Sequence, residues 1–91
     1  MAAEPRRLRC QDLIRRLARF GVVVARQRGG HIILLKPSTP GGTKERTYPV
    51  GCHRPTVEVS IPVIRAVLRA FEIPDAAFWA EEWNSVTRDH D

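Results

Sequence analysis

Apolar positions divide the chain into two helical patterns separated by a stretch of alternating residues. The first helix is predicted over Leu8 to Phe20, with Gly21 in the place of a left-handed C-terminal cap. Its arginines fall on the solvent side, where Asp12 can pair with Arg16 one turn later. The apolar stripe that we expect to face the core comprises Leu13, Ile14, Leu17 and Phe20.

The middle of the chain predicts three antiparallel strands. Val22 to Arg28 is rich in β-branched residues, Gly29-Gly30 is a tight-turn signal, and His31 to Lys36 forms the return strand. Pro37 to Thr43 has the composition of a turn or loop. Lys44 to Val50 then alternates well enough for a third strand.

Two helical segments are predicted in the last third of the chain. Gly51 to Val59 is irregular, and Ser60 can cap a second long helix that Pro74 ends. Asp75 can cap a short last helix. The apolar face of the long helix comprises Ile61, Ile64, Val67, Leu68 and Phe71, and the short helix carries Phe78, Trp79 and Trp83.

This order of elements predicts one small α+β domain. Both long helices can bury their stripes on one face of a three-stranded antiparallel sheet, with the short C-terminal helix appended. The α-β-β-β-α arrangement is that of double-stranded RNA-binding domains. We expect a basic segment over 1–7, a single domain over 8–83 and a tail over 84–91.

The charge distribution favours a polyanionic partner. Fifteen Lys and Arg oppose ten Asp and Glu, and all but two of the cations are arginine. The planar guanidinium suits bidentate phosphate contacts, so a nucleic acid is the expected partner. A basic protein without such a partner is the alternative. No apolar stretch is long enough for a bilayer and no secretory signal opens the chain, so we expect a cytoplasmic protein without membrane contact.

The two cysteines, Cys10 and Cys52, can form at most one disulfide, which a reducing cytoplasm disfavours. A zinc site combining them with His31 and His53 is conceivable, but no CxxC or HxxxH spacing supports it. We therefore expect neither a metal nor another cofactor.

Two histidines are candidates for acid–base chemistry. RNA can be cleaved without metal when one group deprotonates the 2′-hydroxyl and another protonates the leaving 5′-oxygen, and imidazole suits both tasks. His31 is the first candidate and His53 the second. The candidate RNA-binding residues around them are Arg26, Arg28, Gly29, Gly30, Lys36 and Arg54.

The glycine pair before His31 allows two interpretations. Gly29 and Gly30 would let an RNA backbone come close to the imidazole. Alternatively, the glycines only make a hairpin and His31 is a polar residue at its edge. Strict alternation puts His31 on the face of Ile33 and Leu35, and the sequence does not say whether that face is open or covered by helices.

Two stretches resemble the HicA (YcfA-like) family, the mRNA-interferase toxins of type II toxin–antitoxin pairs. They are "RRLARFGVVVARQRGGHIIL" and "YPVGCHRPTVEVSIPVIRAVLRAFEIPDAAF", which together cover most of the chain. The family's Gly-Ser-His motif corresponds to Gly29, Gly30 and His31, with glycine in place of the serine. Its downstream histidine corresponds to His53, with two extra residues before it.

The resemblance implies the double-stranded RNA-binding fold and metal-independent cleavage of mRNA, with His31 as the acid–base residue. It also implies a HicB-type antitoxin as protein partner. Two other functions remain open from the sequence. One is a non-catalytic RNA-binding module of the same fold, and the other is a protein-interaction module that uses Trp79 and Trp83.

Overall fold

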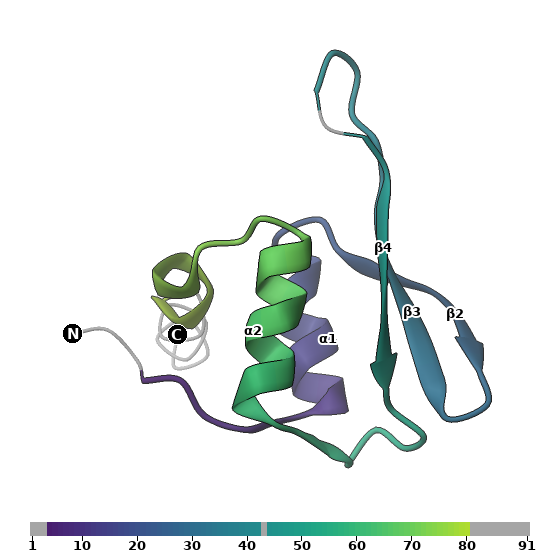
Figure 1. Ribbon diagram of the computed structural model, residues 1–91, viewed down its shortest axis with the longest axis vertical. Coiled ribbons are helices and arrows are strands. Elements are labelled where there is room, and N and C mark those ends of the chain that lie inside the picture. Colours follow the sequence, from purple (N-terminus) through teal and green to yellow (C-terminus); the bar gives the residue numbers. More distant parts are fainter. Residues whose placement is uncertain (1–3, 43, 81–91) are drawn as a thin grey trace, which may run out of the picture.

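A three-stranded antiparallel sheet and two helices on one side of it make up the body of the protein in a computed structural model that describes residues 4–42 and 44–80 (Figure 1). The helices are α1 (Cys10–Ala18) and α2 (Ile61–Ala70). The sheet has the order β2-β3-β4, with the bounds Val23–Arg28, His31–Lys36 and Arg46–Gly51. The predicted α+β class with a three-stranded sheet is therefore confirmed.

The strand register fixes which side chains share a face. Residue pairs run from Arg28–His31 at the hairpin to Val23–Leu35, and from His31–Gly51 to Lys36–Arg46 on the other side of β3. A bulge between Val24 and Arg26 inserts one extra residue in β2. Because paired residues of antiparallel strands point to the same face, the bulge resets the alternation of β2.

The core lies between the sheet and the helices. Ile32, Leu34 and Val50 point from the sheet to this side and are buried. The helices oppose them with the predicted stripes, and the buried members of these are Leu13, Leu17, Ile64, Val67 and Leu68. Leu17 and Leu34 are fully shielded from solvent. Burial of these apolar surfaces is what holds the helices on this face.

The structure also contains a two-stranded antiparallel ribbon that the sequence did not predict. It pairs β1 (Leu8–Arg9) with β5 (Glu58–Val59). As a result, α1 begins two residues later than predicted, because Leu8 and Arg9 are in β1. Ser60 does precede α2 at the N-cap position, although its side chain makes no capping hydrogen bond.

Cys10 and Cys52 form a disulfide, which corrects the expectation that they would stay unbonded. Their Cα atoms are 6.1 Å apart although 42 positions separate them in sequence. The first amides of α1 bring this about, because the Cys10 N–H donates to the Val57 carbonyl at 2.8 Å and the Gln11 N–H to the Pro55 carbonyl at 3.0 Å. The bond takes both thiols out of the candidate zinc set.

Residues 75–80 are helical, as predicted, and fix two aromatic side chains in the core. Phe78 is fully buried, and Trp79 is only 2% exposed. Trp79 therefore packs against the body of the domain, as is usual for such a residue in a small domain, and is not on the surface where an interaction module would need it. Trp83 lies outside the described residues. None of the helices in the described part of the chain combines the length and the apolar character needed to cross a membrane.

Arg16 differs from its predicted place on the solvent side of the first helix. Its guanidinium carbon lies 5.6 Å from the centroid of the Trp79 ring, a cation–π contact. Burial, with a smaller contribution from Arg6, lowers the pKa of Arg16 to about 10, so the side chain is still charged at neutral pH. Asp12 forms an ion pair with Arg15 at 3.4 Å, and its carboxylate also acts on Arg16, whose pKa it raises against the effect of burial. Arg16 therefore packs the C-terminal helical segment against α1.

Candidate functional site

The two candidate histidines lie at the same end of the sheet, each against a glycine of the opposite segment. A Cβ atom added at Gly51 would lie 4.0 Å from Nε2 of His31, and one added at Gly30 would lie 3.5 Å from Cβ of His53. The Cys52 N–H donates to the Gly30 carbonyl at 2.8 Å, which joins the two segments beyond the last strand pair. The Gly-Gly-His segment (29–31) and the Gly-Cys-His segment (51–53) thus lie side by side.

His31 lies on the face of the sheet that the helices leave open. It alternates with the buried Ile32 and Leu34, and its own side chain is exposed. The face that it shares with Ile33 and Leu35 is the one opposite the helices, because the core-facing residues are the other set. The alternation that left its orientation undecided therefore gives a solvent-facing imidazole. An imidazole in this position can reach a ligand that lies across the sheet.

Two of the predicted arginines share this open face. Arg28 pairs with His31 across the hairpin and Arg26 pairs with Ile33, so both point to the side of His31. Without the bulge after Val24, Arg26 and Arg28 would point to the helix side. Both side chains are exposed, and within the described residues no carboxylate forms an ion pair with either. They are free to bind phosphate groups.

The structure does not bring Lys36 to the histidine end. Lys36 is the last residue of β3, five positions from His31, or about 17 Å along a strand. It pairs with Arg46, whose guanidinium reaches the Ala70 carbonyl at 3.2 Å and the Glu72 carboxylate at 3.0 Å on the helix side. Lys36 thus belongs to the opposite end and the opposite face, whereas Arg54 follows His53 directly.

The two glycines of the hairpin differ in what they require. Gly29 has a φ of 57°, in the left-handed region, and a Cβ atom there would meet nothing within 4 Å. Gly30 has no positive φ, and its surroundings leave an ordinary van der Waals distance to His53. Gly29 is therefore needed for the turn, while Gly30 leaves room beside His53.

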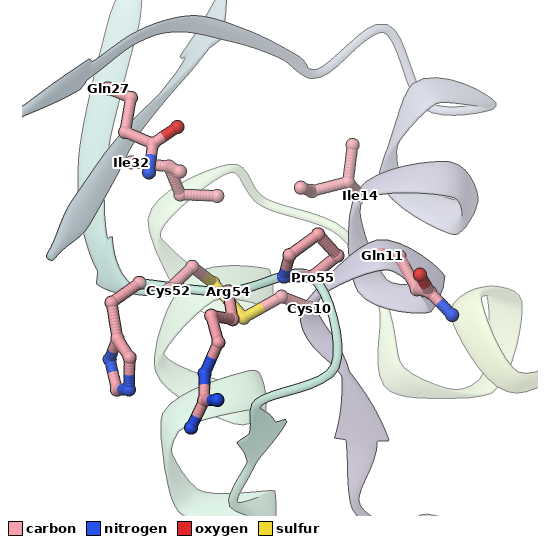
Figure 2. A pocket seen from close by; sticks show the side chains of 9 residues that line it. Cys10, Gln11, Ile14, Gln27, Ile32, Cys52, Arg54 and Pro55 are labelled. Carbon is pink, nitrogen blue, oxygen red and sulfur yellow. A yellow bond between two sulfur atoms is a disulfide. The ribbon is translucent and has the colours of Figure 1, made fainter.

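A cavity of about 350 Å³ adjoins this site on the helix side of the sheet. Figure 2 shows its lining residues, with the disulfide beside Pro55 and with Ile14 of α1 facing Ile32 of β3. His53 and Arg54 belong to the same lining. Sequence reasoning missed this cavity, because its walls come from four separate segments. The sequence reasoning also did not single out Gly51 or Gln27, and only the register reveals their positions.

No protein-family model matches the chain, and no curated protein or solved structure matches it either.

Proposed function

We propose that the protein is an RNA-binding endoribonuclease in which His31 is the acid–base residue. The observation that carries this proposal is the exposed His31 on the open face of the sheet, next to Arg26 and Arg28 and at the same end as His53. Imidazole and guanidinium groups on one accessible surface are the groups that phosphodiester cleavage without metal requires.

The chemistry assigns one task to each kind of side chain. The imidazole of His31 removes the proton of the 2′-hydroxyl. The 2′-oxygen then attacks phosphorus, and the bond from phosphorus to the 5′-oxygen breaks. A second acid, for which His53 is the candidate, gives the leaving 5′-oxygen a proton, so the products are a 2′,3′-cyclic phosphate and a 5′-hydroxyl. Arg26 and Arg28 stabilise the negative charge that builds on the phosphate oxygens.

The order of elements supports a double-stranded RNA-binding type of fold. Helix, three antiparallel strands and helix follow one another, with both helices on one side of the sheet (Figure 1). Together with the resemblance to HicA proteins, this arrangement supports a toxin of a type II toxin–antitoxin pair that cleaves mRNA. The partner would be a HicB-type antitoxin, and an acidic surface on it would complement Arg26 and Arg28.

A non-catalytic RNA-binding module is the second candidate. The same arginines favour it, and Gly30 in place of the family's serine removes a hydroxyl from the site. This candidate predicts RNA binding that weakens with salt and no cleavage products after long incubation. The interaction module based on tryptophans has less support, because Trp79 is buried.

Expression in a bacterial host without any antitoxin tests the proposal. The wild-type protein should arrest growth and deplete mRNA, and His31→Ala should remove both effects because the imidazole is lost. Lys36→Gln is the matched control, since Lys36 lies at the other end of β3 and should leave the arrest intact. Growth arrest of equal strength with His31→Ala would exclude His31 as the acid–base residue.

A further inference from the structure

The cavity beside the histidines is walled by apolar groups and bordered by a few polar ones. Ile14, Ile32, Pro55 and the disulfide form walls around it (Figure 2). Its volume of about 350 Å³ lies at the lower end of the roughly 300–1,000 Å³ found for small-molecule sites. A cavity of this size takes one small group rather than a peptide segment or a large cofactor.

One solvent-exposed amide, that of Gln27 on β2, borders the cavity and can supply directional hydrogen bonds. Gln27 pairs with Ile32 and so points to the helix side of the edge strand β2. In Figure 2 its amide points from β2 toward Ile32 and Ile14, whereas the amide of Gln11 points away from the cavity. A glutamine amide offers one acceptor and two donors at adjacent atoms, which is the pattern that complements the edge of a nucleobase.

The outer border of the cavity is cationic. Arg54 lines the cavity, and in Figure 2 its guanidinium extends outward, away from Ile14 and Ile32. Within the described residues no carboxylate forms an ion pair with Arg54. A group inserted in the cavity would therefore leave a phosphate attached to it close to Arg54. An apolar slot with an exposed amide on one border and a guanidinium on the other is complementary to a nucleotide.

We infer that this cavity binds one unpaired nucleobase of a single-stranded RNA, with Gln27 bonded to the base edge and Arg54 on the adjacent phosphate. This inference rests on the proposed function for its choice of polymer and deepens it. His53 lines the same cavity and lies against Gly30, so a base held there would position its neighbouring phosphodiester at the histidine end of the sheet.

Titration with single nucleotides tests the inference without any cleavage. Each of the four nucleoside 5′-monophosphates is added to the full-length ¹⁵N-labelled protein, and ribose 5-phosphate serves as the probe without a base. At least one nucleotide should shift the Gln27 side-chain amide and the backbone amides of Ile14 and Ile32. Ribose 5-phosphate should leave these three signals in place. No shift with any nucleotide, or equal shifts with ribose 5-phosphate, would overturn the inference.

Three variants separate the two contacts. Gln27→Leu should weaken nucleotide binding about tenfold, because the edge of the base loses its hydrogen bonds. Gln11→Leu is the matched control, with the same chemical change at an amide that points away, and should bind as the wild type does. Arg54→Gln should weaken binding of the monophosphate but not of the corresponding nucleoside. Equal affinities of wild type and Gln27→Leu would contradict the proposed role of Gln27.

Failure of the proposed function and failure of this inference give different results. A nucleoside 5′-monophosphate has no phosphodiester to cleave, so its binding does not depend on His31 chemistry. Binding of nucleotides by a protein that leaves RNA intact would keep the base site and remove the nuclease. RNA cleavage by Gln27→Leu at the wild-type rate, without nucleotide binding by the wild type, would remove the base site and keep the nuclease.

Discussion

At the scale of single residues, the structure sets each of the two histidines beside a glycine. Gly51 faces Nε2 of His31, and Gly30 faces Cβ of His53, so each glycine lies against a histidine that is distant in sequence. The sequence indicated His31, Gly29 and Gly30 as members of a site. It did not indicate the pairing with Gly51, because that contact depends on the register between β3 and β4.

The turn predicts a difference between two matched substitutions. Gly29→Ser should destabilise the protein by roughly 1–2 kcal/mol, because a side chain is strained at its positive φ. Gly30→Ser should change the free energy of unfolding by less than about 0.5 kcal/mol, since its new Cβ stays at an ordinary distance from His53. Urea denaturation of both variants measures the difference. Equal destabilisation by the two would show that this description of the turn is wrong.

At the scale of elements, the sequence predicted the helices and the hairpin, because these depend mainly on residues that are close together in the chain. The apolar stripes gave both helices, and the Gly-Gly signal gave the hairpin between β2 and β3. The ribbon of β1 and β5 escaped prediction, because two residues per strand are too few for any periodicity. The open face of the sheet was undecided for a related reason, since Ile32 and Ile33 are equally apolar and only tertiary packing shows which one is covered.

The disulfide between α1 and the segment after β4 predicts sensitivity to reduction. It closes a separation of 42 positions, for which chain entropy gives a stabilisation of about 2–4 kcal/mol. A thiol reductant should therefore lower the urea midpoint of the wild type. The double variant Cys10→Ser/Cys52→Ser should have a low midpoint that the reductant does not change. Identical wild-type midpoints with and without reductant would mean that the bond contributes no stability.

At the scale of the whole molecule, some arginines are paired with carboxylates, whereas within the described part of the chain the arginines proposed to bind RNA are not. Carboxylates pair with arginines on the helix side and near the termini, as in Arg46–Glu72, Arg65–Asp75 and Arg7–Glu58. The arginines beside the histidines have no such partner among the described residues. Net charge alone predicted a polyanionic partner, whereas the strand register and the bulge in β2 identify the face that would bind it.

Cleavage of single-stranded RNA by the purified protein in a metal chelator tests the central proposal most directly. The wild type should produce fragments that end in 2′,3′-cyclic phosphate, and His31→Ala should cleave at least about a hundredfold more slowly while still binding the RNA. Lys36→Gln should cleave as fast as the wild type. Cleavage by His31→Ala at the wild-type rate, or no cleavage by the wild type itself, would contradict the assignment of His31 as the acid–base residue of a ribonuclease.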